Sequence, residues 1–253
     1  MRILILGGTT EARQLAGRLA ARAGLDVTLS LAGRTAEPAA QPVPVRIGGF
    51  GGAEGLAGYL RARKIDALVD ATHPYAAVIS ANAAAAAAQA GVALVALRRP
   101  AWTPVPGDQW MEIDRMADAV RALGATSRRV FLALGRKEII PFEAAPHHHY
   151  LVRSVDPVVP PLDVPAAVYV TARGPFPEAA ERALLEQHAI DIVVAKNSGG
   201  SATYGKIAAA RALSLPVILL RRPAPPEVAA VETVEEAVDW LDHPPALATA
   251  RGV

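Results

Sequence analysis

The stretch Arg2-Ile3-Leu4-Ile5-Leu6-Gly7-Gly8-Thr9-Thr10-Glu11-Ala12-Arg13 decides the fold. An apolar run as long as a buried strand ends at two glycines, and leucines at helical spacing, Leu15 and Leu19, follow directly. Glycines permit a tight turn close to a phosphate, and the N–H groups of the following helix point at the ligand. The stretch therefore predicts a strand, an anion-binding turn and a helix. An ordinary turn is the alternative, because the third glycine of the G-x-G-x-x-G fingerprint is missing.

Short apolar runs and helical stretches continue to alternate along the chain. Strands are predicted at residues 2–6, 26–31, 43–47, 66–70, 92–97, 129–134, 150–154, 166–171, 191–196 and 216–220. Helices are predicted at residues 10–23, 52–64, 76–90, 115–123, 177–188, 202–213 and 234–241. The strands are apolar throughout rather than at alternate positions, which is typical of a parallel sheet with helices on both faces.

A cluster of prolines and glycine at residues 98–109 interrupts this alternation and predicts a linker. We therefore expect an α/β fold of two Rossmann-like three-layer domains, with mostly parallel sheets and an interdomain cleft. Residues 1–105 would form the N-terminal cofactor-binding domain. Residues 106–242 would form a C-terminal α/β domain that completes the cofactor and substrate site, and residues 243–253 a tail without periodicity.

Composition excludes several classes of protein. The 253 residues are 52% hydrophobic and 20% charged, which excludes wholesale disorder, and the absence of cysteine excludes disulfides and thiol chemistry. With 26 basic and 24 acidic residues, the charge is too balanced for a protein whose main partner is a nucleic acid. No apolar segment predicts a signal peptide or a membrane span, so we expect a cytoplasmic protein. The oligomeric state does not follow from the sequence.

Ligands of open parallel sheets bind beyond the carboxyl ends of the strands, so the residues that follow each strand are informative. Ser30 and Arg34 follow the second strand, where an NAD-specific fold has Asp or Glu. Both suit the 2′-phosphate of NADPH, although Arg34 is also compatible with a solvated surface position. His73 and Tyr75 follow the fourth strand, where a nicotinamide or substrate would pass. Strand-end capping by His73 and packing by Tyr75 are the alternative.

The run from Lys196 to Lys206 is the most informative of the second half. It combines hydroxyls, an amide, three glycines and two of the four lysines around a predicted helix N-terminus. This composition predicts an anion-binding loop, with a solvated loop as the alternative.

Other known arrangements do not fit. Ile207 occupies the Ser/Thr position of a P-loop, and Tyr204 and Lys206 lack the spacing of short-chain dehydrogenases. His147-His148-His149 has no cysteine or adjacent acid to complete a metal shell, so no metal is expected there. A Gly-x-Ser-x-Gly nucleophile elbow is missing from the sequence.

Taken together, four runs resemble the precorrin-6A reductase family of cobalamin biosynthesis. They are Ile5 to Ala12, Asp70-Ala71-Thr72-His73-Pro74-Tyr75-Ala76, Lys196-Asn197-Ser198-Gly199-Gly200 and Thr203-Tyr204-Gly205-Lys206. The resemblance covers residues 1 to about 240. It implies hydride transfer from NADPH to a carbon–carbon double bond of precorrin-6A, which gives precorrin-6B, without a metal or a flavin. Related reductases of the anaerobic pathway act on the cobalt-containing analogue, and the motifs do not separate the two.

The resemblance also implies roles for the residues that follow the strands. The cofactor would be bound by Gly8, Thr9 and Thr10 at the pyrophosphate, by Ser30 and Arg34 at the adenosine end, by Thr72 beside the nicotinamide, and by the loop residues Asn197, Ser198, Gly199, Gly200, Ser201 and Thr203. Candidates for a catalytic proton donor are His73, Tyr75 and Lys196. Precorrin-6A carries many carboxylates, so it would be bound by Arg136, Lys137, Arg173, Tyr204 and Lys206.

Two other functions are compatible with the sequence. One is an NADPH-dependent reductase or epimerase of another substrate, for which a narrow pocket would argue. The other is a non-catalytic NADPH-sensing module, which predicts an exposed apolar patch for a partner.

Overall fold

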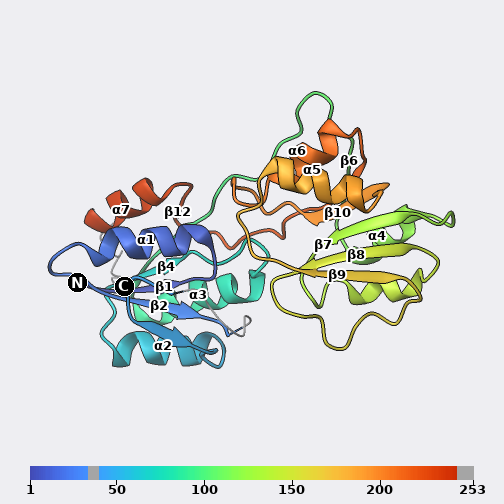
Figure 1. The fold of residues 1–253 in the computed structure, drawn as a ribbon. Coiled ribbons are helices and arrows are strands. Elements are labelled where there is room, and N and C mark those ends of the chain that lie inside the picture. The colour runs from blue at the N-terminus through green and yellow to red at the C-terminus, as the bar shows by residue number, and fades with distance from the viewer. Residues whose placement is uncertain (34–39, 244–253) are drawn as a thin grey trace. The chain divides into compact units, whose positions relative to one another are not determined.

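The computed structural model describes residues 1–33 and 40–243, and the chain forms two compact units (Figure 1). Unit 1 contains residues 1–100 together with the chain from residue 223 onward, and unit 2 contains residues 101–222. The predicted tail falls outside the described residues from position 244. No helix among the described residues is long and apolar enough to cross a membrane.

Unit 1 is built on a sheet of six parallel strands in the order β12-β5-β4-β1-β2-β3. The strands are β1 (Arg2–Leu6), β2 (Asp26–Leu31), β3 (Val45–Ile47), β4 (Ala67–Asp70), β5 (Ala93–Leu97) and β12 (Ala230–Val231). Helices α1 (Thr10–Ala20) and α7 (Val234–Asp242) cover one face, and α2 (Gly52–Ala62) and α3 (Ala77–Ala90) cover the other (Figure 1).

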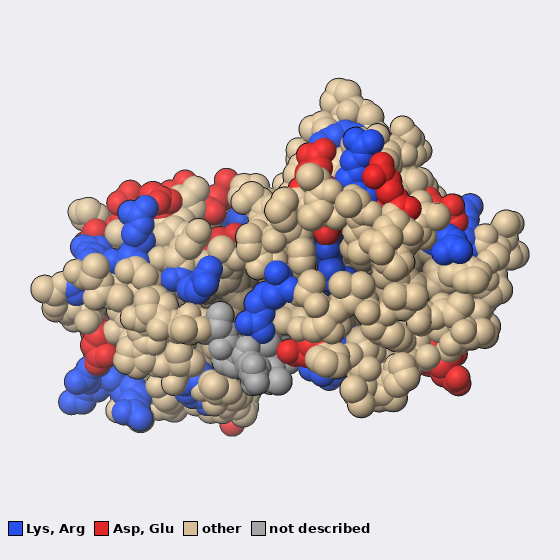
Figure 2. Space-filling view, in the orientation of Figure 1, with Lys and Arg blue, Asp and Glu red and all other residues tan. Residues whose placement is uncertain are grey.

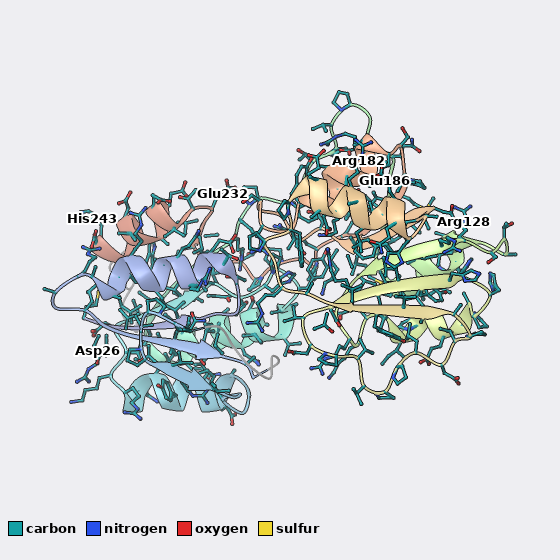
Figure 3. All side chains as sticks on the ribbon, in the orientation of Figure 1. Asp26, Arg128, Arg182, Glu186, Glu232 and His243 are labelled. Carbon is teal, nitrogen blue, oxygen red and sulfur yellow. The ribbon has the colours of Figure 1, made fainter. Side chains whose placement is uncertain are left out.

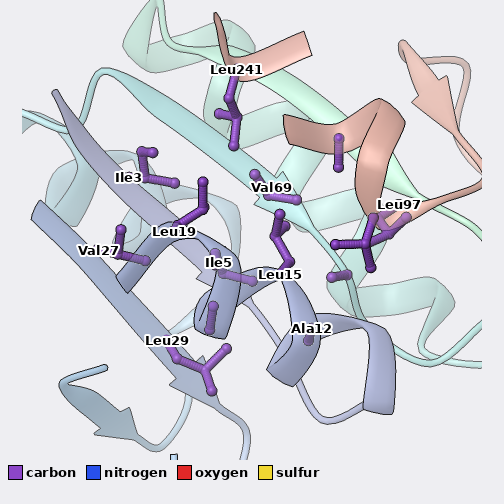
Figure 4. Packing of buried hydrophobic residues seen from close by; sticks show 14 of the residues in the cluster. Ile3, Ile5, Ala12, Leu15, Leu19, Val27, Leu29, Val69, Leu97 and Leu241 are labelled. Carbon is purple, nitrogen blue, oxygen red and sulfur yellow. The ribbon is translucent and has the colours of Figure 1, made fainter. Parts of the chain in front are cut away.

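Both faces of this sheet are buried, which explains the continuous apolar strands. Ile3 and Ile5 pack under α1 and α7 with Leu15 and Leu241 (Figure 4), and their neighbours in β1 belong to the cluster under α2 and α3. Side chains of successive strand residues point to opposite faces, so each β1 residue from Ile3 onward meets a helix layer.

Unit 2 has a second sheet of six parallel strands in the order β6-β11-β10-β7-β8-β9. The strands are β6 (Trp110–Ile113), β7 (Arg129–Ala133), β8 (His149–Ser154), β9 (Ala167–Thr171), β10 (Ile192–Lys196) and β11 (Val217–Leu220). Helices α5 (Glu178–Gln187) and α6 (Gly205–Ala212) cover one face, and α4 (Met116–Leu123) with the 3₁₀ turn η1 (Ile140–Ala144) covers the other. The predicted fold class, two Rossmann-like α/β domains with parallel sheets, is confirmed.

The two sheets share one strand order, and each takes its sixth strand from elsewhere in the chain. Unit 1 reads β3-β2-β1-β4-β5-β12 and unit 2 reads β9-β8-β7-β10-β11-β6, so β6 follows β5 in sequence but pairs with β11. Likewise β12 follows β11 in sequence but pairs with β5, through Ala96 N to the carbonyl of Ala229 at 2.8 Å and Arg98 N to the carbonyl of Val231 at 2.8 Å.

This exchange differs from the predicted domain bounds. The sequence interpretation assigned residues 106–242 to one domain, whereas β12 and α7 belong to the sheet of unit 1. Strand β12 has only two residues, so its periodicity gives no signal, and its pairing is set by a contact more than 100 residues away in sequence. Strand β6 is not among the predicted strands, because it directly follows the proline cluster that predicts a linker.

In this strand order, successive strands are added first on one side of β1 and then on the other, beginning with β4, in unit 1, and likewise on the two sides of β7, beginning again with β10, in unit 2. Such switch points leave a crevice at the carboxyl ends of the strands, where open α/β sheets bind their ligands. The candidate site residues are therefore described around these two points.

Candidate functional site

At the switch point of unit 1, the Thr9 side chain organises the turn after β1. Its Oγ1 accepts the N–H of Ala12 at 3.1 Å and so caps α1, and it donates to the carbonyl of Ala71 at 2.8 Å. Gly8 has a φ of 116°, a conformation that favours glycine. A Cβ on Gly7 would lie 2.6 Å from Leu29 Cδ1. The turn therefore brings the first N–H groups of α1 to the edge of the sheet, next to the end of β4.

A pocket of about 160 Å³ lies at the carboxyl ends of β1, β2 and β4 in unit 1. Its lining consists of Leu6, Gly7, Ser30, Ala32, Gly48, Gly49, Phe50, Gly51, Gly52, Leu56, Thr72, Ile79 and Asn82. Residues 48–52 form a glycine-rich loop that the sequence interpretation missed. The signal was present, because four glycines follow a short strand directly, as glycines also follow β1.

Arg46 holds this glycine-rich loop. Its guanidinium donates to the carbonyls of Gly48 and Gly49, the latter at 2.6 Å, and lies 3.6 Å from the centre of the Phe50 ring. It also donates to Oγ of Ser30 at 3.3 Å. Ser30 is buried, and its hydroxyl faces Arg46 while the residue lines the pocket. Arg34 lies outside the described residues, so Arg46 is the basic residue that the structure places beside Ser30.

The end of β4 carries Asp70, Thr72, His73 and Tyr75. Asp70 is buried, and its carboxylate accepts the N–H of Thr72 at 3.1 Å and the Thr72 hydroxyl at 2.7 Å. The N–H of Tyr75 donates to Nδ1 of His73 at 3.3 Å, and the two rings lie 5.6 Å apart. A neutral His73 with Nδ1 as acceptor carries its proton on Nε2. His73 and Tyr75 thus form one half-buried pair next to the Thr9 turn.

At the switch point of unit 2, Lys196 and Glu138 form an ion pair. Lys196 ends β10, and its Nζ lies 2.9 Å from Oε1 of Glu138, in the turn after β7. A Cβ on Gly135 would lie 2.2 Å from Oε2 of Glu138, so any larger residue there would require the Glu138 side chain to shift. Arg136, Lys137 and Arg173 are exposed in the segments that follow β7 and β9. The structure therefore places four of the predicted cations at this end of the second sheet.

The loop after β10 is anchored from inside by Asn197. Its side-chain oxygen accepts the N–H of Trp102 at 2.8 Å, its side-chain nitrogen donates to the Trp102 carbonyl at 2.9 Å, and the Trp102 indole donates to the carbonyl of Gly200 at 2.8 Å. The amide of Asn197 thus pairs with the backbone of Trp102 rather than pointing outward. Ser201 is exposed, and Ser198, Gly200 and Thr203 are partly exposed, so the loop backbone beyond Asn197 reaches the surface.

Tyr204 and Lys206 also hold this loop. The Tyr204 hydroxyl accepts from Arg211 at 3.0 Å, and its ring packs against Trp102 at 5.7 Å. Lys206 is only 4% exposed, and its Nζ donates to the carbonyl of Thr203 at 2.6 Å. Both residues are predicted from the sequence to bind substrate carboxylates, but the burial of Lys206 and the contacts of Tyr204 depend on tertiary packing. Their positions favour support of the loop, and the exposed Arg136, Lys137 and Arg173 remain the better candidates for substrate.

The three consecutive histidines lie at the opposite end of β8. His148 is 1% exposed, and its Nδ1 accepts the N–H of Arg128 at 3.2 Å. Burial, reinforced by the neighbouring His147, lowers the pKa of His148 below its usual value. Within the part of the chain that the structure describes, no three His, Cys, Asp or Glu side chains are grouped to hold a metal ion.

Surface charge is mixed on both units. On the face drawn in Figure 2, basic and acidic side chains are interspersed, in keeping with the nearly balanced charge of the chain.

Comparison with known proteins identifies the family. Residues 2–242 match the family described as "Precorrin-6x reductase CbiJ/CobK". The chain belongs to this precorrin-6x reductase family. The resemblance predicted from the sequence motifs and the class of enzyme, a reductase, are therefore confirmed.

Individual members of the family are similar over their whole length. A precorrin-6A reductase of Sinorhizobium sp is 59% identical over 96% of this chain and 93% of its own, and that of Rhodobacter capsulatus is 51% identical over 100% and 99%. A cobalt-precorrin-6A reductase of Priestia megaterium is 29% identical over 94% and 97%. A solved structure described as "CobK precorrin-6A reductase" superimposes with a TM-score of 0.93 at 50% identity and covers 100% of both chains.

Proposed function

We propose that this reductase uses NADPH to reduce a carbon–carbon double bond of precorrin-6A to precorrin-6B in cobalamin biosynthesis. The observation that carries the proposal is the difference in identity among its relatives. Five relatives named precorrin-6A reductase are 42–59% identical, whereas three named cobalt-precorrin-6A reductase are 24–29% identical. This difference favours the metal-free macrocycle, which the sequence motifs alone did not distinguish.

The residues of unit 1 fit a dinucleotide. Gly8, Thr9 and Thr10 would hold the pyrophosphate, because the turn directs the first N–H groups of α1 outward and leaves open space at Gly8. The pocket under residues 48–52 would take the adenosine end. Residues 30–33, at the carboxyl end of β2, contain no acid for a ribose 2′-hydroxyl, so we propose NADPH rather than NADH. Arg46, beside Ser30, and Arg34, from its place in the sequence, are the candidate cations for the 2′-phosphate.

The bound cofactor supplies the hydride, and the chain supplies orientation and charge. Thr72, His73 and Tyr75 would flank the nicotinamide, because they follow β4 beside the Thr9 turn. Asp70 fixes Thr72 through two hydrogen bonds, and the Tyr75 N–H fixes the His73 ring with its proton on Nε2. We propose His73 as the first candidate for the proton donor, with Tyr75 and Lys196 as the others.

Unit 2 provides cations for a polycarboxylate substrate. Arg136, Lys137 and Arg173 would pair with substrate carboxylates. Lys196, held by Glu138, would present its ammonium from the end of β10. The backbone of Ser198, Gly199, Gly200, Ser201 and Thr203 would hold either the cofactor or a substrate carboxylate, while Asn197 keeps this loop attached to Trp102.

The proposal is tested by anaerobic oxidation of NADPH with the purified protein and precorrin-6A, with NADH and cobalt-precorrin-6A in parallel reactions. Oxidation that requires metal-free precorrin-6A and prefers NADPH supports the proposal. Faster turnover of the cobalt-containing macrocycle would contradict the substrate, and equal rates with NADH would contradict the cofactor. Tight NADPH binding with neither macrocycle reduced would favour a sensing module instead.

A further inference from the structure

A buried ion pair lies at the carboxyl end of β8, outside the residues assigned above. Arg153, near the end of β8, pairs with Glu181 in the first turn of α5 through NH1 and Oε1, and the two side chains are 6% and 3% exposed. Oε2 of Glu181 is buried and has no hydrogen-bond partner among the described residues. The pair is therefore removed from water without full compensation by hydrogen bonds.

Such a pair is not explained by stability. Taking two charges out of water costs more than their attraction returns unless the geometry and the remaining hydrogen bonds are excellent, and apolar replacement of both partners is often neutral or stabilising. With one carboxylate oxygen unsatisfied, an apolar pair of similar volume would fill the same space at lower cost. The position of the guanidinium supplies another reason for its presence.

The guanidinium of Arg153 faces the ring of Phe176, at 3.7 Å from the ring centre, and lies 5.0 Å from the centre of Phe131. Phe176 belongs to the segment after β9 that carries Arg173. A planar cation over an aromatic face is attracted by the ring quadrupole, and more strongly when both are desolvated. The Arg153 guanidinium therefore stabilises the position of the Phe176 ring through this cation–π contact. The ion pair with Glu181 in turn fixes the guanidinium.

Phe176 in turn fixes the loop after β10. Its N–H donates to the carbonyl of Ala202 at 3.1 Å, and a Cβ on Gly205 would lie 2.2 Å from the Phe176 carbonyl oxygen. A Cβ on Gly174 would lie 3.3 Å from the Phe176 ring and 3.5 Å from the Ala202 carbonyl oxygen. The segment of Arg173 and the loop after β10 are thus joined through the backbone of Phe176, whose ring lies against the Arg153 guanidinium.

We propose that Arg153 is a positioning residue for the reductase. Clamped by Glu181, it holds Phe176 and so sets the places of Arg173 and of the backbone at residues 198–203. Of the two ligands proposed above for this backbone, we take the substrate carboxylate here. The proposal rests on the proposed function for its substrate, but its structural part concerns the protein without ligand.

The decisive variant is the double replacement Arg153→Met with Glu181→Leu, which removes both charges and keeps the volume. We expect it to fold with a melting temperature equal to or above that of the original protein. We expect the KM for precorrin-6A to rise at least tenfold, with kcat changed less and the NADPH affinity unchanged. Arg153→Lys keeps the charge but loses the planar group, so its KM for precorrin-6A should lie between that of the original protein and that of the double replacement. Phe176→Leu should reproduce the increase in KM with the ion pair left intact.

The matched control is Arg182→Met with Glu186→Leu on the same helix. Arg182 and Glu186 form an ion pair along α5 (Figure 3), with Nε and Oε1 3.1 Å apart and side chains that are 53% and 51% exposed. This control should leave the KM for precorrin-6A unchanged. An equal rise in KM in the control would overturn the assignment to Arg153.

Amide hydrogen exchange in the ligand-free protein separates failure of this proposal from failure of the proposed function. The double replacement of Arg153 and Glu181 should increase exchange at Gly174 and Phe176 and at residues 198–205 at least tenfold and leave the β10 amides protected. Unchanged exchange in both segments overturns the positioning role, whatever the activity. If the original protein does not reduce precorrin-6A, the proposed function fails, and the exchange pattern still decides whether Arg153 orders these segments. Increased exchange with an unchanged KM would overturn the link to substrate.

Discussion

The switch point of unit 1, between β1 and β4, presents glycines, threonines and a helix N-terminus, whereas that of unit 2, between β7 and β10, presents Lys196 and Glu138. Both points lie in sheets of the same strand order. In unit 1, α1 begins at Thr10, four residues after β1 ends, so backbone N–H groups are brought to the edge. In unit 2, only a 3₁₀ turn follows β7, so the charge comes from side chains.

Under the proposed assignments, one topology would support two kinds of anion binding. Backbone N–H groups at a helix N-terminus suit a compact pyrophosphate, while flexible cationic side chains suit carboxylates spread over a large macrocycle. The fold positions the two points, and the residues after each strand decide the chemistry. Substitutions that affect one point and spare the other should separate cofactor binding from substrate binding.

The largest effect is expected for Thr9→Asp. Aspartate caps a helix as well as threonine, but it cannot donate to the Ala71 carbonyl and its negative charge would repel the pyrophosphate, so NADPH affinity should fall about 100-fold. Titration of NADPH by fluorescence measures the change. The control is Thr233→Asp, because Thr233 caps α7 through the same contact, Oγ1 to the N–H of Glu236 at 3.1 Å. Equal loss of affinity in both variants would contradict the assignment of the pyrophosphate to the β1 turn.

Lys196→Met should have the next largest effect, and in the other unit. Loss of a charged hydrogen-bonding group should reduce kcat/KM for precorrin-6A about 30-fold, with NADPH affinity unchanged. Steady-state kinetics at saturating NADPH, together with NADPH titration, measure both quantities. Glu138→Gln should give a smaller loss, because it weakens the positioning of Lys196 and leaves the ammonium in place. Weaker NADPH binding in Lys196→Met would indicate that the two switch points do not divide the ligands in this way.

Arg46→Met should weaken NADPH binding about tenfold, because the glycine-rich loop loses the cation that joins two of its carbonyls and packs on Phe50. The KM for precorrin-6A should not change. Arg61→Met is the control, since Arg61 in α2 of the same unit donates to the carbonyl of Gln89 on an exposed surface. Unchanged NADPH affinity in Arg46→Met would contradict the proposal that the adenosine end of NADPH binds in this pocket.

The smallest effect concerns His148, which lies away from both switch points. Its pKa is lowered in the folded protein, so the unfolded chain binds its proton more readily and folding stability falls as the pH decreases below about 6.5. His148→Asn keeps an acceptor for the Arg128 N–H and removes the titration. Melting temperatures at pH 5.5 and 7.5 should then differ by about 1–2 °C less than in the original protein. His243 is exposed, so His243→Asn should not change the difference between the melting temperatures at pH 5.5 and 7.5. If His148→Asn also left this difference unchanged, the pH dependence would not come from His148.

Much of the candidate site followed from local sequence. The Gly7–Thr10 turn, the Asp70–Tyr75 run and the Lys196 loop were found because short-range patterns of glycine, hydroxyl and apolar residues report strand ends directly. The roles of individual side chains were harder to predict. Asn197 pairs with Trp102 across 95 residues of sequence, and Lys206 is buried under that same ring, which no local pattern reveals.

The sequence by itself determined that the chain forms two parallel α/β sheets, where most strands and helices lie, and to which family it belongs, because these depend on periodicity and on contiguous motifs. Only the tertiary structure decided that β6 and β12 complete sheets to which their sequence neighbours do not belong, that Arg46 organises the loop after β3, and that Arg153 and Glu181 are buried together beneath Phe176. These features depend on pairing and burial between residues far apart in the chain. Their energies come from desolvation and long-range contact, which a local pattern does not encode.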